Sequence, residues 1–130
     1  MLNELANEIH KTAVEHGWWN PAPSFGEVVA LCHSELSEAL EEHRADRPMV
    51  YADQIVEASE LDDGLEMQRT TDLRQFSPDD KPEGIAVEMA DCLIRILDWA
   101  AHEGVDMDAV VRAKMDYNKT RPYRHGGKRL

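Results

Sequence analysis

The sequence predicts an all-α fold, a bundle of four helices with an inserted segment between the second and the third. Three observations favour this prediction. Apolar residues recur at helical spacing in four stretches, a capping residue, glycine or proline bounds each stretch, and strand patterns are weak. The 130 residues fit one compact domain, so we expect a single domain over residues 1–130.

The first helix is expected over residues 2–16, where leucine and isoleucine recur on one face, and Gly17 is suited to end it. Residues 18–23, Trp-Trp-Asn-Pro-Ala-Pro, then form a connection because proline breaks a helix. The adjacent tryptophans have two interpretations. They cover the edge of the core, which the residues alone favour, or they form a stacking wall for a base.

The second helix is expected to begin at residues 24–27, whose serine and glutamate fit a capping box, and to end between Arg44 and Pro48. No helical period runs through residues 48–81. We expect an insertion or loop there, with a short helix over residues 53–60 as the alternative. A loop of this length in a compact domain is usually mobile or functional.

The third helix is expected to start near Pro82, which suits a first turn, and to run to about His102. Apolar residues cover most of its circumference, which predicts a position at the centre of the bundle. Asp106 is suited to cap a fourth helix over residues 107–119, and residues 120–130 form a basic tail.

The composition excludes several classes of function. A formal net charge of −12 argues against broad binding to a nucleic-acid backbone. The apolar runs are too short for a membrane span, and no signal peptide is visible. Cys32 and Cys92 lie among apolar residues, which suits small buried side chains in a reducing compartment. We therefore expect a cytoplasmic protein that binds neither nucleic acid nor membrane.

Two pairs of acids, each with a spacing of three residues, lie on expected helices. Glu35 and Glu38 belong to the second helix, and Glu88 and Asp91 to the third. This spacing places each pair on one helix face. If the two helices face each other, four carboxylates meet, and their repulsion and desolvation require a shared cation. Oxygen-only ligands favour Mg²⁺ or Mn²⁺ over zinc.

Either pair alone is better explained as a solvated helix face, because acids at this spacing are common there. The combination is more specific, since one pair lies on the most apolar helix and a basic cluster follows in residues 114–130. An acidic body with a basic tail suggests that a small anion, such as a metal-bound phosphate, is held between them. A ferritin-like di-iron site is discounted because neither His33 nor His102 completes an E-x-x-H motif.

These motifs resemble the MazG-like all-α nucleoside triphosphate pyrophosphohydrolases, which include dCTP pyrophosphatases and MazG-type dUTPases. The family pattern, E-x-x-E on one helix and E-x-x-D on the next, reads here as residues 35–38 and 88–91. A downstream K-M-D-x-N-x-x-R segment is present at residues 114–121. The resemblance covers about residues 5–46 and 82–128, and the acid motifs together with the basic segment carry its specificity.

The resemblance implies hydrolysis of an NTP or dNTP to the monophosphate and pyrophosphate, with the four acids as ligands of Mg²⁺. Three residues of the basic segment would hold phosphate oxygens, and the donor-rich tail adds two more candidates: Lys114, Asn118 and Arg121, with Arg124 and Lys128. His10 and Trp19 match positions where the dCTP enzymes contact the base. The family builds its site across a dimer or a dimer of dimers, so we expect a homodimer or homotetramer.

Two features depart from the family pattern. The separation between Glu38 and Glu88 is longer than usual. Arg95 lies one turn after Asp91, where relatives often carry an uncharged or aromatic side chain. Its expected partners are Asp91, Asp98 or a phosphate.

The expected mechanism is attack of a metal-activated water on the α-phosphorus, with pyrophosphate as the leaving group. Glu38 is predicted to be essential, and Glu41 or Glu42, one turn beyond it, to accept the proton of the water or to hold a further ion. A solvated helix end explains Glu41 and Glu42 equally well. The competing class is a non-enzymatic helical module for oligomerisation or regulation, which would not need all of these residues.

Overall fold

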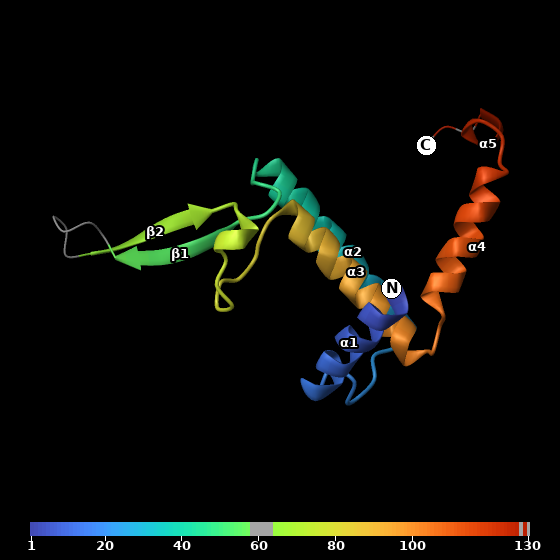
Figure 1. Ribbon diagram of the computed structural model, residues 1–130, viewed down its shortest axis with the longest axis horizontal. Coiled ribbons are helices and arrows are strands. Elements are labelled where there is room, and N and C mark those ends of the chain that lie inside the picture. Colours follow the sequence, from blue (N-terminus) through green and yellow to red (C-terminus); the bar gives the residue numbers. More distant parts are fainter. Residues whose placement is uncertain (58–63, 128, 130) are drawn as a thin grey trace. The chain divides into compact units, whose positions relative to one another are not determined.

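The computed structural model describes residues 1–57, 64–127 and 129. Its elements, in chain order, are α1 (Leu2–Glu15), α2 (Phe25–Arg44), β1 (Ala52–Glu57), β2 (Leu65–Thr70), a 3₁₀ helix η1 (Leu73–Gln75), α3 (Ile85–His102), α4 (Met107–Lys119) and α5 (Arg124–Gly127) (Figure 1). The chain divides into two compact units, which are Ser24–Arg95 and the combination of Met1–Pro23 with Ile96–Leu130. The single domain over residues 1–130 stays a prediction.

The prediction of an all-α four-helix bundle is wrong. The described residues contain five α-helices, and β1 and β2 form a two-stranded antiparallel sheet within the segment expected as an insertion or loop. The alternative of a helix over residues 53–60 also fails, because 53–57 belong to β1 and 58–60 lie outside the described residues. Strand β1 reads Ala-Asp-Gln-Ile-Val-Glu, in which apolar and polar residues do not alternate regularly, and both strands are only six residues long. The sequence signal for strands is therefore weak.

The hairpin is anchored at its base in the Ser24–Arg95 unit. Tyr51 is buried and exchanges two backbone hydrogen bonds of 2.8 Å with Glu83, the residue that leads into α3. Arg69 on β2 binds Asp53 on β1 through two contacts of 2.7 Å, and its guanidinium lies 4.1 Å from the centre of the Tyr51 ring. The Tyr51–Glu83 hydrogen bonds connect the sheet to the segment just before α3. An isolated two-stranded hairpin in water has no such support and is only marginally stable.

Helix α3 begins at Ile85, three residues after the Pro82 expected for its first turn. The cause is Gly84, whose φ of +116° is open to glycine but rarely to other residues. A Cβ at this glycine would lie 2.6 Å from the carbonyl oxygen of Met49, and Ala86, two residues further on, donates its N–H to that oxygen at 2.9 Å. The close approach of the two backbones therefore sets where α3 starts.

The predicted capping box at the start of α2 is confirmed. The N–H of Glu27 donates to the Ser24 hydroxyl at 3.2 Å, and the N–H of Ser24 donates to the Glu27 carboxylate at 2.6 Å. These bonds lower the pKa of Glu27, because the backbone N–H of Ser24 favours the ionised carboxylate. The box satisfies one free N–H of the first turn of α2 and that of the cap residue itself.

Replacing Ser24 with alanine is expected to lower the free energy of unfolding by about 1 kcal/mol, since the cap is lost and the rest of the helix is unchanged. Urea unfolding followed by circular dichroism measures the difference. Ser37→Ala is the matched control, because that hydroxyl bonds to the His33 carbonyl of the same helix and its loss should change stability by less than half as much. Equal effects of the two substitutions would contradict a capping role.

In the other unit, the ends of α1 and α4 cap each other. Asp108 on α4 accepts the N–H groups of Leu2 and Asn3 at 3.0 and 3.1 Å. The Asn3 side chain in turn accepts the N–H of Met107 at 2.8 Å. Asp106 caps α4 by accepting the N–H of Ala109 at 3.0 Å, as the sequence predicts.

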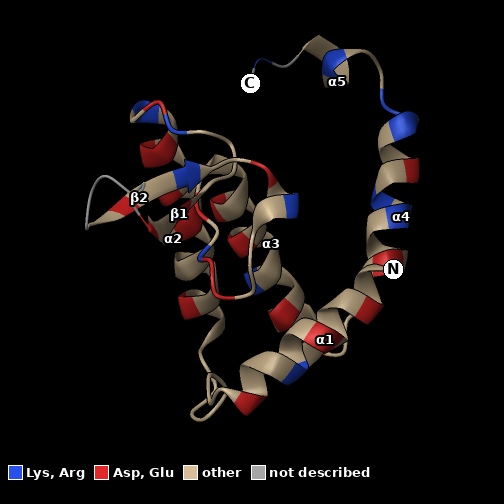
Figure 2. Cartoon of the chain, turned by 60° about the vertical axis from the view of Figure 1, so that its left-hand side comes forward, with Lys and Arg blue, Asp and Glu red and all other residues tan. Residues whose placement is uncertain are grey.

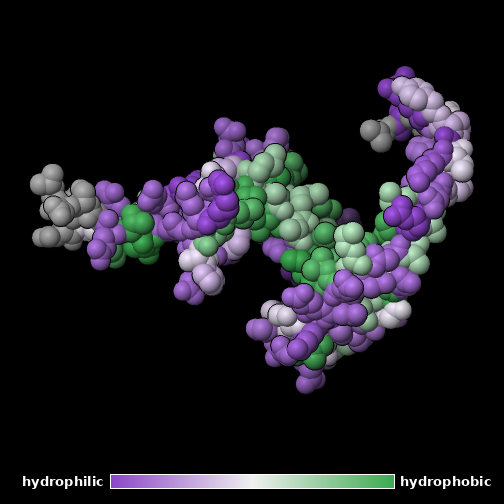
Figure 3. All heavy atoms as spheres, in the orientation of Figure 1, coloured by the Kyte–Doolittle hydropathy of each residue, from purple (hydrophilic) through white to green (hydrophobic). Residues whose placement is uncertain are grey.

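Both units leave much apolar surface uncovered, and Figure 3 shows this surface along α2 and α3. Among the described residues, Leu97 is the one large side chain that is completely buried. Exposed apolar residues recur at helical spacing on both helices, as Val29, Leu36 and Leu40 on α2 and as Met89, Leu93 and Ile96 on α3. No helix in the described part of the chain combines the length and the apolar character that crossing a membrane requires.

A candidate metal centre

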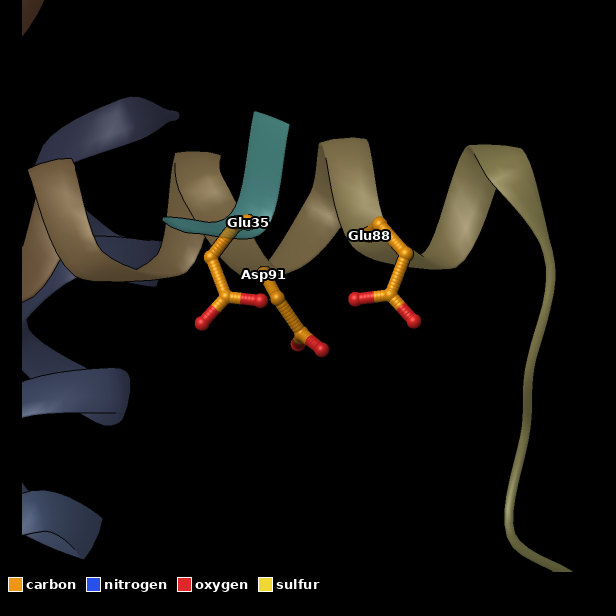
Figure 4. A group of neighbouring side chains, drawn as sticks. All are labelled: Glu35, Glu88 and Asp91. Carbon is orange, nitrogen blue, oxygen red and sulfur yellow. The ribbon is translucent and has the colours of Figure 1, made fainter. Parts of the chain in front are cut away.

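Three carboxylates from two helices meet in the Ser24–Arg95 unit. Glu35 on α2 and Glu88 and Asp91 on α3 each offer one oxygen, and these oxygens all lie within 4.8 Å of one another. Figure 4 shows the three side chains pointing the same way from their helices. Glu35 is only 6% exposed, and the other two are half-buried. The sequence predicted this convergence from the spacing of the acids.

Two features of the backbone put these side chains together. Helix α2 and the first part of α3 lie side by side in Figures 1 and 2, so that one face of each is turned toward the other. Glu88 and Asp91 are three residues apart and therefore share a face of α3. Ala39 on α2 and Cys92 on α3 are both buried small residues.

The cluster holds more negative than positive charge and is electrostatically unfavourable without a further cation. Burial raises the pKa of Glu88, and the neighbouring charges of Glu38, Asp91 and Glu35 raise it further. Burial also raises the pKa of Asp91, helped by Glu35, while Arg95 acts in the opposite direction. Carboxylates that resist ionisation in this way are relieved when a positive ion binds among them.

The donor set fits a hard divalent ion. Three carboxylate oxygens from two rigid helices, with no nitrogen or sulfur ligand among them, suit Mg²⁺ or Mn²⁺. Mg²⁺ is typically bound by one or two carboxylates, with waters and substrate phosphates completing six ligands. The described cluster can therefore hold such an ion and leave positions open for a phosphate.

Glu38 is not part of the close trio, although the sequence predicted four converging acids. Its carboxylate receives a long hydrogen bond of 3.4 Å from Ser34, and the residue is exposed. It is close enough for its charge to raise the pKa of Glu88. Glu41 is paired with Arg44 at 2.6 Å, an ordinary surface ion pair.

Sequence reasoning missed the partner of Arg95. Its side chain binds Glu35, with Nε donating to Oε1 at 2.7 Å, whereas the expected partners were Asp91, Asp98 or a phosphate. The spacing along one helix places Arg95 beside Asp91, but it does not tell which residue of α2 faces it. A second cation, Lys81, binds Glu83 at 3.1 Å, and the charges of Glu88 and Glu38 also raise the pKa of Lys81.

The two base-binding candidates lie in the other unit, in a cluster around Asp98. The Asp98 carboxylate accepts the indole N–H of Trp19 at 2.9 Å and lies 2.7 Å from Nδ1 of His10. One face of Trp19 stacks on His102, with ring centres 3.9 Å apart and planes at 15°. A base would thus have to use the opposite face of the indole or its edge. Neither Asp98 nor His102 was predicted as a partner of these residues.

The phosphate-binding candidates are on and after α4, where Figure 2 shows Lys and Arg residues in blue. They belong to the same unit as the Asp98 cluster. Lys114 and Arg121 lie over the ring of Tyr117, at 5.0 and 5.9 Å from its centre. Asn118 lies in the last turn of α4, and its backbone carbonyl accepts the N–H of Arg121 at 3.2 Å. Arg124 lies 5.7 Å from the ring centre of Tyr123. One further candidate, Lys128, lies outside the described residues.

Comparisons with protein-family models, curated proteins and solved structures found no match for the chain. The geometry of the acid trio is therefore the main support for a function, and the family resemblance stays a prediction.

Proposed function

We propose that the chain is a nucleotide pyrophosphohydrolase of the MazG-like class, which uses Mg²⁺ or Mn²⁺ to cleave an NTP or dNTP to the monophosphate and pyrophosphate. One observation carries the proposal, the meeting of Glu35, Glu88 and Asp91 from two helices within 4.8 Å. An oxygen-only set of this kind suits an ion that also binds phosphate oxygens. The basic K-M-D-x-N-x-x-R segment at residues 114–121 adds support from the sequence.

The side chains have separate tasks in this proposal. A bound Mg²⁺ would supply charge neutralisation and an activated water. Glu35, Glu88 and Asp91 would hold this ion through their carboxylate oxygens. Glu38, one turn from Glu35, accepts only a long hydrogen bond of 3.4 Å from Ser34 among the described residues, and it would take the proton of the water. Glu41 is the second candidate base, but it first has to leave Arg44.

The remaining residues bind the substrate. The side chains of Lys114, Asn118 and Arg121, with Arg124 and Lys128, hold the phosphates and stabilise the charge on the departing pyrophosphate. His10 and Trp19 contact the base. These residues belong to the other unit.

A homodimer or homotetramer is part of the proposal. The exposed apolar stripes on α2 and α3 support it, because soluble monomers rarely expose contiguous apolar surface of this kind. We also propose the cytoplasm as the compartment. Cys32 and Cys92 are free thiols, and burial raises the pKa of Cys32, as expected for inert cysteines under reducing conditions.

A panel of NTPs and dNTPs, each with and without Mg²⁺, tests the proposal. We expect monophosphate and pyrophosphate as products only when the metal is present. In ¹⁸O-labelled water the label should enter the monophosphate, because attack is at the α-phosphorus. Release of a diphosphate with inorganic phosphate would contradict the reaction. Absence of any turnover across the panel would favour the non-enzymatic helical module.

Mg²⁺ should stabilise the chain more at neutral than at acidic pH. The raised pKa values of Glu88 and Asp91 mean that the folded chain binds more protons than the unfolded chain as these groups titrate. The free energy of unfolding therefore falls as pH rises through this range, and repulsion is largest above it. We expect millimolar Mg²⁺ to raise the melting temperature clearly at about pH 7.5 and far less at about pH 4.5. Equal shifts at both pH values would contradict a carboxylate site.

A further inference from the structure

Arg95 is the cation that already occupies the acid cluster. Its Nε donates to Oε1 of Glu35 at 2.7 Å, and its Nη2 lies 2.5 Å from the same oxygen. The Glu35 side chain is 8% exposed, so solvent screens this pair much less than a pair at the surface. Glu35 is also the most buried member of the trio. Glu35, a proposed ligand of the metal, is therefore already paired with a cation of the protein.

The Arg95 guanidinium and a divalent ion compete for the Glu35 carboxylate. Both are positive, and both gain most by binding the anion that is furthest from water. If the ion binds Glu35 while Arg95 remains, the two cations share one carboxylate and repel each other at short range. If Arg95 leaves, it loses two charge-assisted contacts in a partly buried position. In either case Arg95 weakens the binding of the ion.

The phosphates of a nucleotide change this balance. A triphosphate brings several negative charges, which offset the repulsion between the ion and the guanidinium and give Arg95 a new anion to bind. The metal and the nucleotide then stabilise each other in the site, which is a positive coupling between two ligands. The side chain of Arg95 is 38% exposed, so its guanidinium is accessible to a substrate.

We propose that Arg95 is a built-in competitor for the divalent ion, which keeps Glu35 neutralised until the metal arrives together with nucleotide phosphates. The inference rests on the proposed function, because it assigns regulation to the same site. In this proposal Arg95 changes the affinity for the metal through its ion pair with Glu35, without contacting the metal. The proposal also gives a reason why Arg95, a cation, lies beside the three acids Glu35, Glu88 and Asp91.

The test is calorimetric titration of Mn²⁺ into the full chain without nucleotide. In Arg95→Gln the competitor is gone, and Mn²⁺ is expected to bind about tenfold tighter than in the wild type. Arg95→Lys keeps the charge, so its affinity should stay within about threefold of the wild-type value. In the double variant Glu35→Gln with Arg95→Gln, the gain should disappear, because the contested carboxylate has been removed.

The matched control is Arg74→Gln, which removes the same charge from an ion pair with Asp72 in the same unit. It should leave Mn²⁺ affinity unchanged. Circular dichroism and a thermal melt check the fold of each variant. If Arg95→Gln does not fold, Arg95→Met replaces it, because methionine keeps the aliphatic part of the side chain. The same increase in Mn²⁺ affinity is expected for it.

Unchanged or weaker binding of Mn²⁺ in Arg95→Gln would overturn the proposal, and so would a failure of this variant to bind the ion at all. Nucleotide hydrolysis is measured separately on the wild type. If the wild type cleaves nucleotides but Arg95→Gln gains no affinity, the enzyme assignment stands and the competition fails. If the affinity rises as expected but no nucleotide is cleaved, the competition stands and the proposed function fails.

Discussion

Glu35→Gln is expected to abolish Mg²⁺-dependent cleavage of nucleotides while the chain stays folded. Glutamine keeps the size of the side chain but replaces a charged oxygen with an amide, which is a poor ligand for Mg²⁺ beside Glu88 and Asp91. Its remaining oxygen can still accept from Arg95, so the contact between α2 and α3 is weakened but not lost. We expect activity to fall by more than about 100-fold. Release of pyrophosphate at saturating Mg²⁺ measures this.

The control for this substitution is Glu66→Gln, which makes the same chemical change at an exposed position of β2 in the same unit. Its activity and its melting temperature should match those of the wild type. The decisive comparison is the response of each variant to Mg²⁺. The ion should raise the melting temperature of Glu66→Gln but not that of Glu35→Gln. Full activity in Glu35→Gln would remove the acid trio from the site.

Gly84→Ala is expected to have the largest effect on stability. The added Cβ would lie 2.6 and 2.7 Å from the carbonyl oxygens of Met49 and Pro48, both of which are backbone atoms. The φ of +116° is also strained for any residue with a side chain. We expect the free energy of unfolding to fall by about 3 kcal/mol or more. Urea unfolding monitored at 222 nm, the usual helix signal, measures this.

Gly26→Ala is the control for this loss, because it makes the same substitution in the first turn of α2. The nearest side-chain atom to its Cβ would be the Ser24 hydroxyl at 3.9 Å, an ordinary contact. Stability should stay the same or rise by up to about 1 kcal/mol, since alanine favours a helix. Gly84→Ala should also weaken Mg²⁺ binding, because Glu88 lies one turn further along α3. Similar midpoints for the two variants would show that the backbone at residue 84 can relax without cost.

The four longer helices could be predicted from the sequence because each has a strong local signal. The capping box at Ser24 and the cap at Asp106 define where two of them begin. The start of α3 could not be predicted, because it depends on the close approach of Gly84 to residues 48 and 49, which lie far away in the sequence. The hairpin was missed because strand pairing is a contact between segments, and its strands are only six residues long.

Glu35, Glu88 and Asp91 were predicted to converge as part of a set of four acids with Glu38, because acids three residues apart share one face of a helix. Helical periodicity could not show that Glu38 stays outside the trio, because the rotation of one helix against another decides that. The same holds for Arg95 with Glu35 and for Trp19 with Asp98. These are long-range polar contacts, and no local pattern in the sequence carries them.

The scarcity of fully enclosed side chains has a thermodynamic consequence. With Leu97 as the one large residue completely buried among those described, a separate chain has little interior from which to gain cohesion. If copies associate through the stripes on α2 and α3, folding and association become one linked equilibrium, and the melting temperature rises with protein concentration. Dilution would then dissociate the copies and unfold the chain, as a denaturant unfolds a domain that is stable alone.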